Sequence, residues 1–157
     1  MLQTRDGEMR IAIVEDDVDF SKRVEKQVRD FFRGEQERLH IWRAICTNSA
    51  AVFEAVKKQD RFDVYLFDIE MPGEKKGGLE LGKMVQELNP QGKIIFLTSY
   101  SKYAVVGYQM GAYYYILKNS SWRAELTKIL GCILREREES NDHDSAGRRH
   151  AAVPAAE

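Results

Sequence analysis

Acidic residues stand directly after two apolar runs of the sequence. Glu15 and Asp16 follow the run at residues 10–14, and Asp68 follows the run at 62–67. Short apolar runs of this kind are typical of buried strands. Carboxylates held together repel one another unless a cation compensates them, and their oxygens suit Mg²⁺. A carboxylate can also act as a nucleophile and form an aspartyl-phosphate, so this set could bind a metal and accept a phosphoryl group.

Two other polar groups follow strand-like runs later in the chain. Thr98 and Ser99 come after residues 93–97, and Lys118 comes after residues 113–117. A hydroxyl can bond a phosphate oxygen, and an amine supplies positive charge beside it. Ligands of an open α/β sheet bind beyond the carboxyl ends of its strands. We therefore expect these side chains and the carboxylates to meet at one edge of a sheet.

Segments with helical periodicity alternate with the apolar runs. Strands are expected at 10–14, 39–46, 62–67, 93–97 and 113–117, and helices at 19–34, from 48 or 49, at 79–88, 101–110 and 121–138. Asp17 or Asp19 is expected to cap the first helix, and Asn48 or Ser49 the second. Five strands alternating with five helices predict an α/β fold, with a parallel sheet covered by helices on both faces.

Composition excludes several classes of protein. The chain has 157 residues, 43% of them hydrophobic and 31% charged, and a net charge of −1. These values suit one globular domain and provide no excess of basic residues for nucleic acid. The apolar runs are too short to cross a membrane, and the first eight residues lack a secretion signal, so we expect a cytoplasmic protein. Cys46 and Cys132 lie far apart without metal-type spacing.

One ordered domain is expected at residues 9–139. Residues 140–157 contain no apolar period and are expected to form a disordered tail or the remnant of a linker.

Four blocks of the sequence together resemble the receiver domain of bacterial two-component response regulators. They read Ile-Val-Glu-Asp-Asp at 13–17, Leu-Phe-Asp-Ile-Glu-Met-Pro-Gly at 66–73, Phe-Leu-Thr-Ser at 96–99 and Tyr-Ile-Leu-Lys at 115–118. The blocks occur in the family's order and span roughly residues 9–138. The resemblance implies a flavodoxin-like, doubly wound sheet with strand order 2-1-3-4-5.

The resemblance also implies a role for each residue of the site. Glu15 and Asp16 would hold Mg²⁺, together with Asp68 and the backbone carbonyl of Glu70. Asp68 would be the phosphoacceptor.

Three residues would respond to the phosphoryl group. Thr98 would bond one of its oxygens, Lys118 would pair with its charge, and Tyr115 matches the family's switching aromatic residue, which turns inward as Thr98 moves.

The implied function is phosphoryl transfer from a sensor histidine kinase to Asp68, which switches a protein interface. The domain would catalyse its own phosphorylation and dephosphorylation, so it is a signalling domain rather than a metabolic enzyme. A homodimer would form through the fourth helix, fifth strand and fifth helix. The wording at 67–72 and 97–101 further resembles regulators with a LytTR-class output domain. DNA would be bound only through such a domain, which is not recognisable in this sequence.

Two features depart from the family pattern. Lys118 is normally followed by a proline joined through a cis peptide, whereas here Asn119 follows. Because a cis bond before a non-proline residue costs about 2.5–4 kcal/mol, we expect either a trans bond with a shifted loop or a cis bond held by the site. The loop after Asp68 is also about two residues longer than the family norm. Lys75 and Lys76 in that loop could contact the phosphate, but a mobile solvent loop is the favoured interpretation.

Two alternative functions remain open. A pseudo-receiver would keep the fold as a binding module without phosphorylation. A phosphohydrolase of the haloacid-dehalogenase type would also use an aspartyl nucleophile, but its Asp-x-Asp motif follows the first strand, whereas Asp68 follows the third.

Overall fold

The computed structural model describes residues 7–45 and 48–149, with side chains as far as Ser140. Five strands and five α-helices alternate along the chain, with one short 3₁₀ helix before the second strand. Their bounds are β1 Met9–Val14, α1 Val18–Phe31, η1 Gln36–Arg38, β2 Leu39–Ala44, α2 Ser49–Lys57, β3 Val64–Phe67, α3 Gly77–Leu88, β4 Lys93–Thr98, α4 Ala104–Gln109, β5 Tyr114–Leu117 and α5 Trp122–Arg149.

The strands form one parallel sheet in the order β2-β1-β3-β4-β5. This is the predicted order, and it places β1 and β3 side by side although the second strand lies between them in the sequence. The strand order reverses at this point because β2 lies on one side of β1 and β3 on the other. Such a reversal opens a crevice at the carboxyl ends of the strands.

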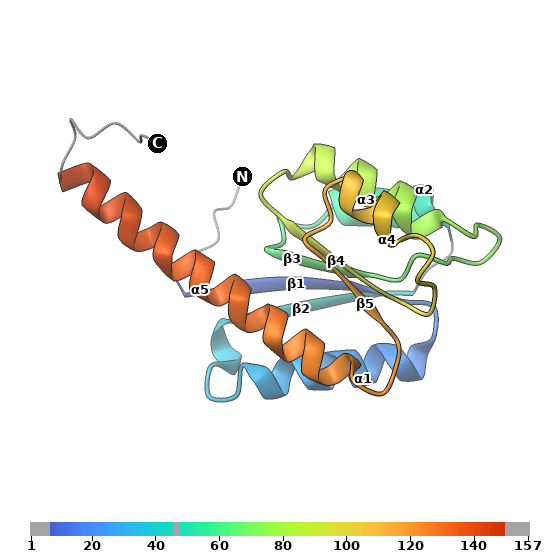
Figure 1. Cartoon of the computed structure of the whole chain (residues 1–157), viewed down its shortest axis with the longest axis horizontal. Coiled ribbons are helices and arrows are strands. Elements are labelled where there is room, and N and C mark those ends of the chain that lie inside the picture. The colour runs from blue at the N-terminus through green and yellow to red at the C-terminus, as the bar shows by residue number, and fades with distance from the viewer. Residues whose placement is uncertain (1–6, 46–47, 150–157) are drawn as a thin grey trace.

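Helices cover both faces of the sheet, as Figure 1 shows. Helices α1 and α5 pack on one face, and α2, α3 and α4 lie on the other. Each face has its own apolar core, because the strands are buried on both sides and alternate side chains point to opposite faces. Ile11 and Ile13 therefore belong to the α1/α5 core, whereas Ala12 and Val14 belong to the other.

The helix starts confirm the predicted caps. The carboxylate of Asp17 accepts a hydrogen bond from the amide of Phe20 at the start of α1. The side chain of Asn48 accepts one from the amide of Ala51 at the start of α2. Both contacts satisfy backbone donors that have no partner within the helix.

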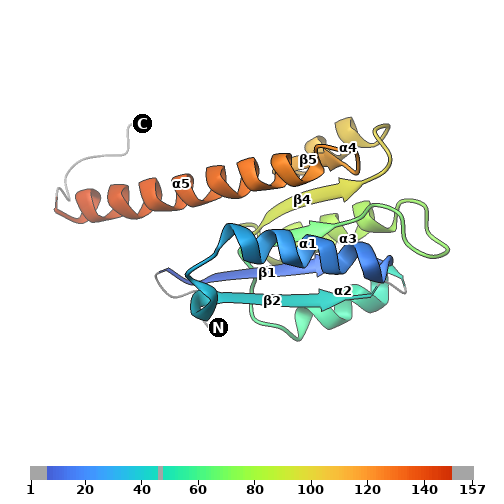
Figure 2. The ribbon, with the colours of Figure 1, turned by 90° about the horizontal axis from the view of Figure 1, so that it is seen from below.

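Helix α5 is longer than predicted. It was expected to end at Glu138, but it continues to Arg149 and extends past the edge of the sheet (Figure 2). A helix that is already nucleated by packing adds further residues without a new nucleation cost, so a polar continuation needs no apolar period. The tail expected from residue 140 is thus helical as far as Arg149, whereas residues 150–157 and Cys46 lie outside the described residues.

Within the described parts of the chain, no helix combines the length and the apolar character that crossing a bilayer requires.

Candidate functional site

The register of β1 and β3 brings two acidic residues together. Val14 pairs with Phe67, so Glu15 and Asp68 follow adjacent strands at the same level. The amide of Asp68 donates to the carbonyl of Val14 at 3.1 Å. This backbone contact carries the strand pairing one residue further and fixes the start of the loop that follows Asp68.

Three carboxylates converge at this edge, as predicted. One oxygen from each of Glu15, Asp16 and Asp68 lies within 4.8 Å of the others. Glu15 and Asp68 are buried, at 3% and 7% exposure, whereas Asp16 is exposed. Two buried acids and one open to solvent form a donor set of oxygens on the rim of the sheet, which fits a hard cation such as Mg²⁺.

Lys118 reaches this cluster from the end of β5. Its ammonium lies 2.9 Å from Oδ2 of Asp68 and 3.0 Å from Oε1 of Glu15. The same ammonium lies 4.6 Å from the centre of the Phe20 ring. No peptide bond among residues 7–45 and 48–149 is cis, so the bond to Asn119 is trans, and Lys118 still reaches Asp68.

Burial and charge act together on the ionisation of this cluster. The pKa of Glu15 is raised to about 7, chiefly by burial and also by the negative charge of Asp68, while the Lys118 ammonium acts to lower it. Burial alone would lower the pKa of Lys118, but Asp68 and Glu15 raise it above its usual value. One ammonium thus only partly compensates the crowded carboxylates, which favours the binding of a further cation.

Thr98 and Tyr115 lie on the neighbouring strands. Thr98 is fully buried at the end of β4, and its hydroxyl accepts a hydrogen bond from the amide of Tyr100 at 3.4 Å. Its carbonyl accepts the amide of Lys118 at 2.8 Å. Tyr115 is 9% exposed, and its phenol donates to the carbonyl of Tyr100. The candidate switch residue is therefore turned inward and bonded to the loop that follows Thr98.

One contact that the sequence does not predict joins the loop after Asp68 to the loop after Thr98. The phenol of Tyr100 donates to Oε1 of Glu70 at 3.0 Å. The amide of Glu70 faces Oδ1 of Asp68 at 3.4 Å. In the sequence Tyr100 is one of several tyrosines near the fourth helix, and no local pattern pairs it with a residue thirty positions away.

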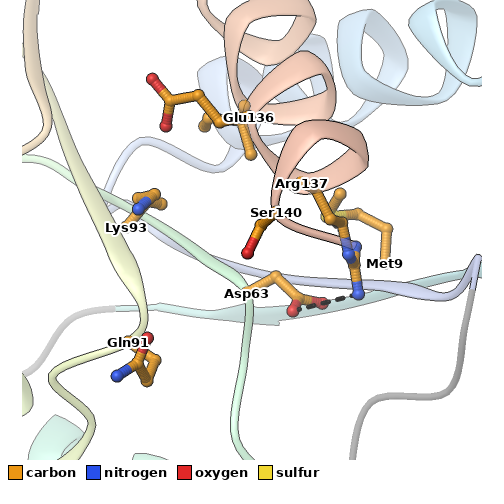
Figure 3. Close-up of a pocket in the computed structure, with 8 residues that line it drawn as sticks. Met9, Asp63, Gln91, Lys93, Glu136, Arg137 and Ser140 are labelled. Carbon is orange, nitrogen blue, oxygen red and sulfur yellow. Dashed lines mark hydrogen bonds and ion pairs between the residues drawn. The ribbon is translucent and has the colours of Figure 1, made fainter. Parts of the chain in front are cut away.

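A small void of about 10 Å³ is lined by Glu15, Asp68 and apolar residues of β1, β3, β4 and α1. A much larger hollow of about 270 Å³ lies at the opposite edge of the sheet, where Met9 begins β1 and Lys93 begins β4 (Figure 3). The larger hollow is remote from the carboxylates, so cavity size does not mark the site here.

Comparison with known proteins agrees with the fold. Residues 11–130 match the family model of the response regulator receiver domain. Accessory gene regulator protein A from Staphylococcus aureus is 30% identical over 129 residues, which cover 80% of this chain and 52% of that protein. The chain thus spans about half the length of the curated relatives it matches.

Solved structures are similar over most of the chain. The response regulator protein TrrA from Thermotoga maritima, in complex with Mg²⁺ and BeF, is 25% identical, with a TM-score of 0.64. The match covers 80% of this chain and 98% of the TrrA chain. A CheY-like receiver domain from Methanospirillum hungatei has 26% identity and a TM-score of 0.67, with coverage of 85% and 99%. With the family match over residues 11–130, these similarities show that the chain belongs to the response regulator receiver domain family.

Proposed function

We propose that Asp68 accepts a phosphoryl group from a sensor histidine kinase in a Mg²⁺-dependent reaction. The observation that carries this proposal is the contact of Lys118 with Asp68 at 2.9 Å inside the cluster of three carboxylates. A carboxylate oxygen of Asp68 would attack the phosphorus of a phosphohistidine. The new P–O bond forms as the P–N bond breaks, and the imidazole leaves.

The donor set fits Mg²⁺. Glu15, Asp16 and Asp68 supply oxygens within 4.8 Å of one another, and the backbone carbonyl of Glu70 would add a further ligand. Bound there, the cation would neutralise charge on the oxygens of the transferring group. The Mg²⁺-BeF complex of the Thermotoga maritima regulator supports this choice of metal.

Lys118 and Thr98 would hold the phosphorylated form. The added charge and acceptor oxygens attract the ammonium of Lys118 and the hydroxyl of Thr98. Since the amide of Tyr100 bonds that hydroxyl and Tyr115 bonds the carbonyl of Tyr100, movement of Thr98 changes the contacts of the β4–α4 loop. Phosphorylation would then favour one of two loop arrangements.

The surface that responds would be the face formed by α4, β5 and α5. Val105, Val106 and Tyr108 on α4 are exposed at 68%, 49% and 46%. Adjacent exposed apolar side chains suit a protein interface, and we propose a homodimer through this face. Control of transcription would require an output domain, of the LytTR class by sequence resemblance, to contact DNA.

The pseudo-receiver alternative is less well supported, since a module that does not use phosphate has no need for three converging carboxylates and a paired lysine. The phosphohydrolase alternative is also disfavoured, since Asp68 follows β3 rather than β1, and residues 11–130 match the receiver family model.

Beryllofluoride and Mg²⁺ test this proposal through tryptophan fluorescence, to which Trp42 and Trp122 both contribute. The indole ring of Trp122 lies 4.9 Å from the ring of Phe20, which in turn faces Lys118. With Mg²⁺ already saturating, we expect beryllofluoride to cause a further saturable change that is lost in Asp68→Asn. A response that is equal in Asp68→Asn would contradict the assignment of the acceptor.

A further inference from the structure

The loop after Asp68 is bound to the start of α2. Oε1 of Glu74 accepts the amide of Ser49 at 2.7 Å, and Oε2 accepts the Ser49 hydroxyl at 2.9 Å. Ser49 is 5% exposed and is the first residue of α2. The first turn of α2 contains no acidic residue of its own, so Glu74 brings a negative charge to this helix end from a distant part of the chain.

The same loop is closed on itself by backbone contacts. The amides of Met71 and Glu74 each donate to the carbonyl of the other residue at 2.9 Å. Gly73 adopts a positive φ of 75° in the turn between them. Glu74 is therefore the last residue of a tight turn that begins one residue after Glu70.

The far end of the loop is fixed against the acceptor itself. The amide of Gly78 donates to the carbonyl of Ile69 at 2.6 Å. A Cβ at Gly78 would lie 1.9 Å from the carbonyl oxygen of Asp68, so only glycine permits this approach. These contacts differ from the mobile solvent loop favoured by the sequence. Lys76 also lies over the ring of Tyr103, at 5.8 Å.

We propose that Glu74 is a positioning residue that anchors the loop after Asp68 to α2 and so holds the backbone of Glu70 in place for the metal. This inference rests on the proposed function, because it concerns the same metal site. A loop that also visits other conformations has a lower apparent affinity for its ligand, because only the fraction of molecules in the competent conformation can bind it. The carboxylate of Glu74 accepts two hydrogen bonds, one from the amide and one from the buried hydroxyl of Ser49. Bonds of this charged kind are strong enough to determine that fraction.

Titration of Mg²⁺ alone, followed by tryptophan fluorescence, measures the effect. In Glu74→Ala, which removes both bonds, we expect the Kd for Mg²⁺ to rise about three- to tenfold. Ser49→Ala removes one of the two bonds and should give a smaller rise in the same direction. The double variant should bind Mg²⁺ no more weakly than Glu74→Ala, since both substitutions remove one anchor.

Glu80→Ala is the matched control, because Glu80 is an exposed acid in the first turn of α3 and its substitution removes the same carboxylate. Its Kd should stay within about twofold of the wild type. Hydrogen exchange of the backbone N–H groups at 70–76 should be faster in Glu74→Ala than in Glu80→Ala.

Three outcomes separate the possibilities. A raised Kd in the Glu74 and Ser49 variants alone supports the anchor. An unchanged Kd in Glu74→Ala, or an equal loss in Glu80→Ala, overturns the positioning role and leaves the proposed function intact. A wild-type protein that binds no Mg²⁺ overturns both.

Discussion

The phenol of Tyr100 donates a hydrogen bond to the carboxylate of Glu70 at 3.0 Å, and this bond joins the two loops that flank Asp68. Both side chains are exposed, so the bridge lies at the surface of the site. It links the loop carrying a proposed metal ligand to the loop that follows Thr98. The lifetime of a phosphoryl group on Asp68 should therefore depend on it.

Tyr100→Phe removes this bridge without a change in ring size. We expect the phosphoryl group on Asp68 to be lost about two- to fivefold faster, because an unbridged pair of loops admits water more readily. Glu70→Ala should have a similar effect, and the double variant should add little. Dephosphorylation after removal of the phosphodonor measures the rate. Unchanged lifetimes in both single variants would show that the bridge does not limit hydrolysis.

Lys118→Met tests the charge balance of the cluster. Without its ammonium, the buried carboxylates of Glu15 and Asp68 lose their cationic partner. We expect the free energy of unfolding to fall by about 2–4 kcal/mol in the absence of Mg²⁺ and by less in its presence. Urea denaturation with and without Mg²⁺ measures both values.

Lys102→Met is the control for that experiment, since Lys102 is exposed and lies over the rings of Tyr100 and Tyr103. It should change stability by less than about 0.5 kcal/mol. An equal loss in both variants would mean that the contacts of Lys118 with the carboxylates contribute nothing specific.

Alkaline titration reports on the inward position of Tyr115. Burial raises the pKa of Tyr115 to about 12 from the usual 10.0, and the negative charge of Asp68 also raises it. The folded state therefore holds the phenol proton of Tyr115 more tightly than the unfolded state does. The resulting contribution of Tyr115 to the free energy of unfolding is complete below pH 10 and is lost as the pH rises towards 12.

The difference in tyrosinate absorbance between the wild type and Tyr115→Phe isolates this group. We expect its midpoint near pH 12. A midpoint at the ordinary value of a solvent-exposed phenol would mean that the ring of Tyr115 is exposed to solvent.

Helix α5 makes polar contacts at the end of the sheet remote from Asp68. Arg137 lies 3.5 Å from Asp63, beside the hollow shown in Figure 3, and Glu136 accepts the phenol of Tyr113 at 2.8 Å. Arg137→Met should lower stability by less than about 1 kcal/mol, because this pair is partly exposed. Hydrogen exchange in α5 beyond Ile133 should nevertheless become faster than in the control Arg135→Met. Equal exchange in the two variants would mean that Arg137 does not hold the helix.

Much of the fold follows from local sequence patterns. The apolar runs that precede Glu15 and Asp68 predict buried parallel strands, and the acids at their ends predict the cluster that the register assembles. The caps at Asp17 and Asn48 are short-range features, so they could also be predicted.

Other features depend on contacts between distant parts of the chain. Glu74 bonds Ser49 across 25 positions, and no periodicity or motif signals such a pair. The length of α5 was underestimated because its continuation has no apolar face, although helix propagation does not require one. The sequence leaves both a cis and a trans bond open at Asn119, because it does not show where Lys118 can reach.

Transfer from acetyl phosphate tests the central claim most directly. Intact mass and peptide mapping would follow the wild type and Asp68→Asn with and without Mg²⁺. The account predicts one phosphoryl group per wild-type chain, located on Asp68 and dependent on Mg²⁺, and none in Asp68→Asn. Modification of Asp68→Asn to the same extent, or a wild-type chain that stays unmodified with Mg²⁺ present, would contradict it.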